Sequence, residues 1–160
     1  MTSPPIAYAS VVVLAHLVLL GIGVWLLIID ARTHRLPNRI VLPTLGGAIV
    51  LVMADALVTG EVWTLARSVG GMLILGGFYA VMRAASRGGI GGGDVKLAAV
   101  IGVVLGWHGW EQLVIGAAAA FVLAALYALV LMALRRATRS TRIAFGPWMI
   151  VGALIGVVLT

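Results

Sequence analysis

Apolar runs of about 20 residues alternate with short polar segments along almost the whole chain. This pattern is typical of transmembrane helices, because a helix of about 20 apolar residues crosses the hydrocarbon core of a bilayer. Six spans are predicted, with boundaries good to about 2–4 residues. They cover residues 6–29, 40–58, 63–82, 94–107, 112–134 and 143–159. We therefore expect an all-α integral membrane protein.

The fourth predicted span is short for a helix that must cross about 30 Å of hydrocarbon. Residues 91–93, directly before it, are all glycine. The helix therefore either begins below the membrane surface or is continued by this glycine-rich loop. A short helix that begins in a polar recess suits an active site.

Basic residues concentrate in the loops after the first, third and fifth spans. These segments hold ten of the eleven basic residues: Arg32, Arg35, Arg39, Arg83, Arg87, Lys96, Arg135, Arg136, Arg139 and Arg142. The positive-inside rule places these loops in the cytoplasm and both termini outside. Asp55, Glu61 and Glu111 then fall on the outer side, whereas Asp30 and Asp94 fall among the arginines.

The composition excludes several classes of protein. Of the 160 residues, 62% are hydrophobic and 10% charged, whereas a soluble domain is about half apolar. We expect one membrane domain over residues 1–160. The net charge of +6 suits anionic lipid headgroups and topology better than nucleic acid. No cysteine is present, which excludes thiol nucleophiles and cysteine zinc sites. Residues 1–5 lack a basic residue, so the first span is expected to be a retained helix, not a signal peptide.

Asp30 closes the first span and Asp94 opens the fourth. An ionisable group at membrane depth is costly and therefore indicates a functional site. A structural alternative remains for each residue. Asp94 would cap its helix, and Asp30 would pair with Arg32, Arg35 or His34. Capping does not explain Gly91-Gly92-Gly93, which would let another backbone, such as an extended substrate, approach closely.

Two carboxyl groups on one side of the bilayer suit peptide hydrolysis. One, ionised, activates water, and the other, protonated, donates to the carbonyl oxygen; repulsion between two acids in one site supplies this asymmetry. A helix C-terminus disfavours a carboxylate and an N-terminus favours one. The predicted helix ends therefore suggest Asp94 as the base and Asp30 as the acid.

Other polar residues give weaker signals. His34 follows Asp30 by four residues, a spacing that suits metal ligation on a helix, but Leu36-Pro37 follows at once and indicates a loop. We expect no metal and no cofactor. Lys96 either tunes Asp94 and steers substrate or extends its charge to the membrane surface.

Three segments resemble the prepilin peptidases, membrane aspartyl proteases that process type IV pilin-like precursors. The family's first catalytic motif is similar to Asp30 with Arg35-Leu36-Pro37-Asn38 and Pro43. Its Gly-x-Gly-Asp motif is similar to Gly91-Gly92-Gly93-Asp94-Val95-Lys96-Leu97 with Gly102 and Gly106. The Phe-Gly-Pro stretch that opens its last helix is similar to Ile143-Ala144-Phe145-Gly146-Pro147-Trp148.

The resemblance implies removal of a basic leader from a pilin-like precursor at the cytoplasmic membrane face of a prokaryote. Asp30 and Asp94 would be catalytic, with Gly91, Gly93, Lys96, Pro37 and Asn38 supporting them. Larger members carry an additional N-terminal region with paired cysteines, associated with methyltransferase activity. This cysteine-free chain resembles the short peptidase-only type, so that activity is not expected.

Two alternatives stay open. A presenilin-like intramembrane protease shares Gly-x-Gly-Asp, but the chain lacks a Tyr-Asp motif, and its aspartates lie at the ends of predicted spans. A non-enzymatic membrane subunit or small transporter would use the aspartates as a cation or proton site. Such a protein would keep partial function after Asp→Glu substitution, whereas a catalytic dyad would not.

Overall fold

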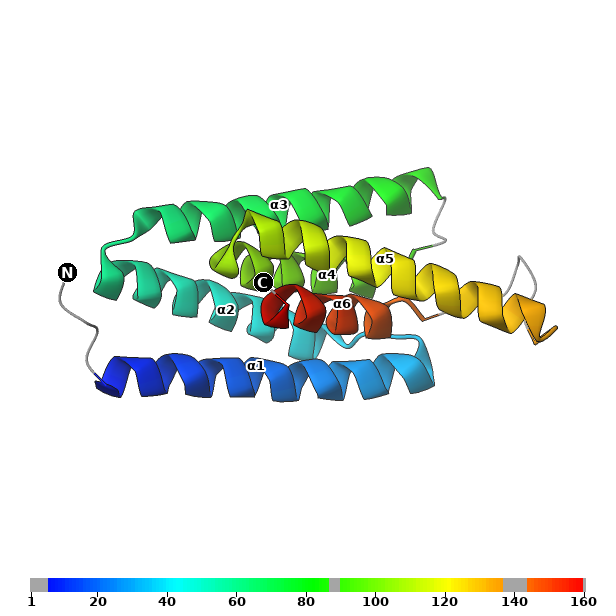
Figure 1. Ribbon diagram of the computed structural model, residues 1–160, viewed down its shortest axis with the longest axis horizontal. Coiled ribbons are helices and arrows are strands. Elements are labelled where there is room, and N and C mark those ends of the chain that lie inside the picture. The colour runs from blue at the N-terminus through cyan, green and yellow to red at the C-terminus, as the bar shows by residue number, and fades with distance from the viewer. Residues whose placement is uncertain (1–5, 87–89, 137–143, 160) are drawn as a thin grey trace.

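The computed structural model describes residues 6–86, 90–136 and 144–159, and this part of the chain is all-helical, as predicted. Its boundaries differ from the predicted ones by at most four residues. Arg87, Arg139, Arg142, Ile143 and residues 1–5 lie outside the described residues. Within the described residues the helices are α1 (Ile6–Thr33), α2 (Asn38–Thr59), α3 (Val62–Ala85), α4 (Gly92–His108), α5 (Trp110–Ala133) and α6 (Gly146–Val158) (Figure 1).

Four of these helices, α1, α2, α3 and α5, are long and apolar enough to cross a membrane. The other two are shorter, with 17 residues in α4 and 13 in α6. At 1.5 Å per residue they rise only about 26 and 20 Å, less than the hydrocarbon thickness. The described residues thus form a multi-pass membrane protein with four candidate spans. Six spans, with both termini outside, remain a prediction.

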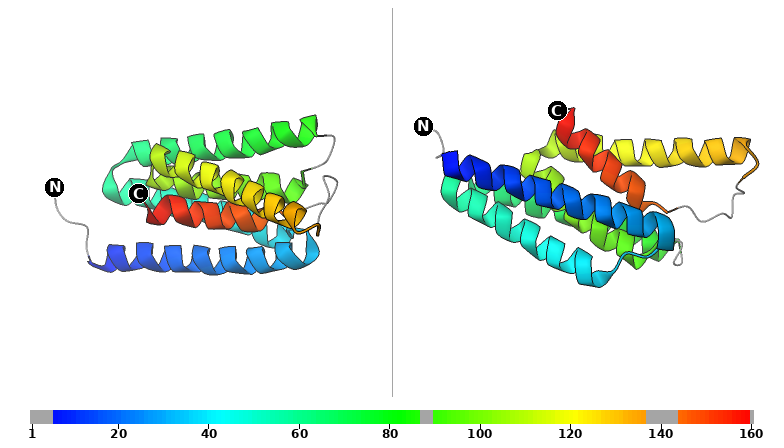
Figure 2. Two further views of the ribbon diagram at one scale, coloured as in Figure 1. Left: turned by 45° about the vertical axis from the view of Figure 1, so that its right-hand side comes forward. Right: turned by 90° about the horizontal axis from the view of Figure 1, so that it is seen from below.

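Successive helices run in alternating directions, so the connections gather at two ends of the bundle (Figures 1 and 2). The α1–α2 connection, the end of α3 and the starts of α4 and α6 lie at one end, which we call the basic end. It carries Arg32, Arg35, Arg39, Arg83, Lys96, Arg135 and Arg136. The α2–α3 and α4–α5 connections lie at the opposite, acidic end, near Asp55, Glu61 and Glu111.

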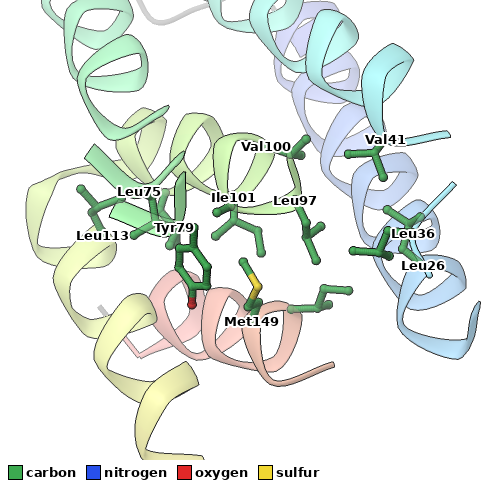
Figure 3. Packing of buried hydrophobic residues seen from close by; sticks show 13 residues of the cluster. Leu26, Leu36, Val41, Leu75, Tyr79, Leu97, Val100, Ile101, Leu113 and Met149 are labelled. Carbon is green, nitrogen blue, oxygen red and sulfur yellow. The ribbon is translucent and has the colours of Figure 1, made fainter. Parts of the chain in front are cut away.

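The short helix α4 forms the centre of the bundle and contacts α2, α3, α5 and α6. Figure 3 shows its Leu97 and Ile101 between Leu26 of α1 and Tyr79 of α3. Leu97 and Leu105 are almost fully buried. A helix that is apolar on all sides belongs inside a bundle. The surrounding helices therefore shield α4 from lipid, and its short length is accommodated inside the protein.

Glycines bring α4 and α3 into backbone contact. A Cβ atom added to Gly71 would lie 2.3 Å from the carbonyl oxygen of Gly102, and one added to Gly106 would lie 2.5 Å from that of Arg67. Gly152 of α6 approaches α5 in the same way. Small residues allow such close packing in lipid, where the hydrophobic effect does not drive helix association. Glycine thus permits close helix packing at two interfaces, α3–α4 and α5–α6.

Substitution of Gly71 by alanine is expected to destabilise the α3–α4 interface. Overpacking of this kind costs about 1–3 kcal/mol, because a helix backbone cannot move aside as a flexible side chain can. The matched control is Gly77→Ala on the same helix, where an added Cβ meets nothing within 4 Å. Thermal unfolding in detergent should show a lower midpoint for Gly71→Ala alone. Equal midpoints would contradict the close contact.

Candidate active site

Asp30 lies in the last turn of α1 and is only 4% exposed. The sequence predicted that it ends its helix, but α1 continues to Thr33. The helix ends at His34, whose backbone adopts a left-handed φ of 51° and donates its N–H to the Asp30 carbonyl at 2.9 Å. The extra turn directs the Asp30 carboxylate into the bundle, towards the start of α6.

The start of α6 supplies a partner for this carboxylate. Gly146 is the first residue of α6, and its N–H donates to Oδ2 of Asp30 at 3.1 Å. A Cβ atom on Gly146 would lie 2.5 Å from the same oxygen, so a larger residue would displace the carboxylate. Pro147 suits this position because the first turn leaves backbone N–H groups unpaired. Helix N-termini attract anions, and Asp30 occupies this one.

Asp94 lies in the first turn of α4, where its Oδ2 accepts the N–H of Gly91 at 3.1 Å. The helix begins two residues before Asp94, within the tolerance of the predicted boundary. Gly92 and Gly93 are already helical, and Gly91 is the N-cap. A carboxylate three residues into a helix commonly satisfies the N-cap amide in this way. Most of the expected glycine-rich loop is therefore the first turn of a helix.

The first two motifs meet in space. Pro37 is the N-cap of α2, and Asn38 begins that helix. Lys96 Nζ donates to Oδ1 of Asn38 at 2.7 Å. A Cβ on Gly93 would lie 2.7 Å from Cβ of the buried Leu36, so Gly93 permits this close approach. Lys96 thus joins α4 to the start of α2. This contact between helices is additional to the roles considered for Lys96 from sequence.

The two aspartates, 64 residues apart in the chain, lie close enough for their charges to interact. Asp30 also interacts electrostatically with His34. Asp94 interacts with Arg83 and with the buried Tyr79. The structure therefore brings both sequence-predicted carboxylates into one cluster at the basic end. Among the described residues, no three or more His, Asp or Glu side chains are grouped to hold a metal ion.

Two neighbours of Asp94 were not recognised as site residues from sequence. Tyr79 and Arg83 lie one turn apart on α3, so both reach the cluster from one helix face. Arg83 Nη1 donates to the carbonyl of Ile90 at 2.9 Å and lies against Gly92. Tyr79 packs on Phe145, with ring centroids 5.8 Å apart. The available signal was a tyrosine one turn before the arginine that follows the third predicted span.

The geometry also removes the helix-end argument for distinguishing the two acids. Asp30 was expected at an unfavourable helix C-terminus, yet it accepts an amide from the N-terminus of α6. Asp94 likewise accepts one N-terminal amide. The N-terminus of α6 thus favours a carboxylate at Asp30 and offsets the unfavourable C-terminus of α1, so helix ends alone do not distinguish the two acids.

A family model described as "Type IV leader peptidase family" matches residues 17–135, which include both aspartates. The chain belongs to this family. Prepilin leader peptidase/N-methyltransferase of Dickeya chrysanthemi is 37% identical to this chain, over 91% of the chain's length and 50% of the relative's length. The protein of that name from Escherichia coli K12 is 32% identical over 80% of the chain and 55% of the relative.

A shorter relative matches over most of its length. Leader peptidase HopD of Salmonella typhimurium is 28% identical over 80% of this leader peptidase family member and 81% of the relative. The first-mentioned relatives are longer, and the chain spans about half their length. No solved structure matches the chain.

Gly146→Ala is expected to destabilise the protein because the added methyl group meets the Asp30 carboxylate and breaks its amide hydrogen bond. Leaving a buried acceptor unpaired costs about 1–3 kcal/mol. In an Asp30→Ala background the same substitution should cost much less, because there is no carboxylate to displace. A double-mutant cycle on the free energy of unfolding in detergent measures this coupling. Additive effects would contradict the contact.

Proposed function

We propose that this protein is a membrane aspartyl endopeptidase that removes the basic leader from type IV pilin-like precursors. The observation that carries the proposal is the meeting of Asp30 and Asp94, which come from separate helices and interact electrostatically at the basic end. Membership of the leader peptidase family supports the substrate class. The proposed catalytic unit is a single peptidase domain over residues 1–160 that uses no cofactor.

The proposed chemistry needs water, one ionised carboxyl and one protonated carboxyl. The ionised group removes a proton as water attacks the scissile carbonyl carbon, and the protonated group donates to the carbonyl oxygen. Charge repulsion between neighbouring acids favours the singly protonated pair. The backbone amides of Gly91 and Gly146 hold the two carboxylates in position. Both assignments of acid and base are compatible with this geometry.

The depth of the aspartates favours cleavage near the membrane surface over cleavage within hydrocarbon. Asp30 lies in the last turn of α1 and Asp94 in the first turn of α4. A presenilin-like protease that cuts in mid-membrane would need both groups deeper in their helices. The positive-inside rule supports a cytoplasmic location of this end, in the cytoplasmic membrane of a prokaryote.

The positive charge of the loops at the basic end suits binding to lipid headgroups better than binding to a basic leader. A basic leader would be repelled by the arginines at the basic end, whereas anionic lipid headgroups would be attracted. We therefore propose that the loops hold the protein at the membrane surface, and that the leader is recognised elsewhere. The expected partners are the precursor and membrane lipids, and nucleic acid is not among them.

Asn substitution of Asp30 or Asp94 is expected to abolish cleavage of a pilin-like precursor. Loss of an essential acid or base lowers rates by about 100–10,000-fold, and Glu substitution should be almost as damaging because it shifts the carboxyl group. Precursor size in co-expressing membranes measures cleavage. Glu111→Gln, at the opposite end, is the control for expression and folding. Cleavage that survives Asp30→Asn or Asp94→Asn would overturn the aspartyl mechanism.

The proposed orientation predicts which end is reachable from outside the cell. The chain contains no cysteine, so one introduced thiol is a unique label site. A membrane-impermeant maleimide should label the exposed Thr59→Cys variant in intact cells. It should label the exposed Ser86→Cys variant only after the membrane is opened, because Ser86 lies at the basic end. The reverse pattern would place the aspartates outside.

A further inference from the structure

Helix α1, which carries Asp30, is loosely packed along its middle. Only 11% of the residues in its apolar stretch are buried, against 22–28% in the other three long helices. A cavity of about 390 Å³ lies along its inner face and is lined by Leu17, Leu20, Val104 and Ala153, among others. In lipid, helices are held together by packing and hydrogen bonds, not by the hydrophobic effect. Polar contacts near its ends therefore matter for α1.

One such contact lies at the acidic end, far from the aspartate pair. The hydroxyl of Tyr8, in the first turn of α1, donates to Oδ1 of Asp55 on α2. The indole Nε1–H of Trp107 on α4 donates to the other oxygen, Oδ2, at 2.8 Å. One carboxyl group thus ties α1 to α4, the helix that carries Asp94.

Ring packing reinforces this tie. His16, two turns further along α1, lies 4.8 Å from Trp107 and 5.1 Å from His108 between ring centroids. Its Nδ1 lies 2.7 Å from the carbonyl oxygen of Val12. A carbonyl oxygen only accepts, so Nδ1 is the donor and the orientation of the ring is fixed. The indole that binds Asp55 therefore also packs against α1.

We propose that Asp55 is a positioning residue for Asp30, an inference that rests on the function proposed above. Tyr8 and Asp30 are separated by roughly 33 Å along α1, at 1.5 Å per residue. At the basic end, α1 is tied by the bond from Gly146 to Asp30; at the acidic end, it is tied by Asp55. Because the packing between these ends is loose, release of the acidic end lets α1 tilt and shifts Asp30 relative to Asp94.

The first test follows the position of α1 and needs no substrate. A Cβ on Gly23 would lie 3.6 Å from Cγ2 of Ile150, so Gly23→Cys with Ile150→Cys reports the α1–α6 distance by disulfide cross-linking. Gly76→Cys with Ala99→Cys reports the α3–α4 interface, where the added Cβ would lie 3.2 Å from that of Ala99. Asp55→Ala should lower the cross-linking yield of the first pair and leave that of the second unchanged.

The second test follows catalysis of precursor cleavage. Asp55→Ala should lower kcat by about 10–100-fold, since displacement of a reacting group by about 1 Å costs up to 100-fold. KM should stay within about twofold, because substrate binding is not altered. Tyr8→Phe should have a smaller effect that is absent in the Asp55→Ala background. The matched control is Glu111→Ala, which removes an exposed carboxyl group from the same end and should leave kcat unchanged.

The outcomes separate this inference from the proposed function. Failure of the wild type to cleave any precursor would overturn the proposed function, and the cross-linking result would still decide the position of α1. A folded Asp55→Ala variant with wild-type cross-linking or wild-type kcat would overturn the positioning role. If Asp55→Ala does not fold, Tyr8→Phe carries both tests, because it removes one hydroxyl from a half-buried side chain.

Discussion

The arrangement of the cluster depends on one requirement, that a carboxylate buried among apolar helices has a hydrogen-bond donor. Asp30 is buried, and its donor is the N–H of Gly146 at the start of α6. That bond determines where α6 begins and requires a residue without a Cβ at its first position. It also fixes the inner end of α1 against α6. The Phe-Gly-Pro segment thus supplies the donor for Asp30, although Gly146 lies 116 residues further along the chain.

The second aspartate depends on the central helix. Asp94 is correctly placed only if α4 reaches into the bundle, and α4 does so because Gly102 and Gly106 allow α3 to approach its backbone. At the other side of the site, Gly93 allows Leu36 to approach the first turn. Each contact uses the absence of a side chain, so the positions of both carboxylates rest on close backbone packing more than on bulky apolar side chains.

Hydropathy predicted the helices well because each is a long apolar run, and their limits agree within four residues. It could not predict the last turn of α1 or the first turn of α4. There the helix continues through polar residues and glycine: Asp30 binds the N–H of Gly146 on α6, and Asp94 binds the N–H of Gly91 at the start of its own helix. The candidate carboxylates were found because charge is rare in a membrane chain. Tyr79 and Asp55 were missed because their roles depend on contacts between helices, which leave no local pattern.

The difference between the two acids must therefore arise from their neighbours, because each accepts one helix-terminal amide. Asp30 is the more buried and interacts with His34, whereas the half-buried Asp94 interacts with Arg83 and Tyr79. An arginine beside one member of a pair favours the ionised form of that member. Burial disfavours the charge of both carboxyl groups, and the charge of Asp30 further disfavours that of Asp94. These effects oppose one another at Asp94, so they are compatible with either assignment of acid and base. Arg83 beside Asp94 and His34 beside Asp30 each stabilise the ionised form of the neighbouring carboxyl group, and the balance between these cations and the burial of each acid determines which one holds the shared proton.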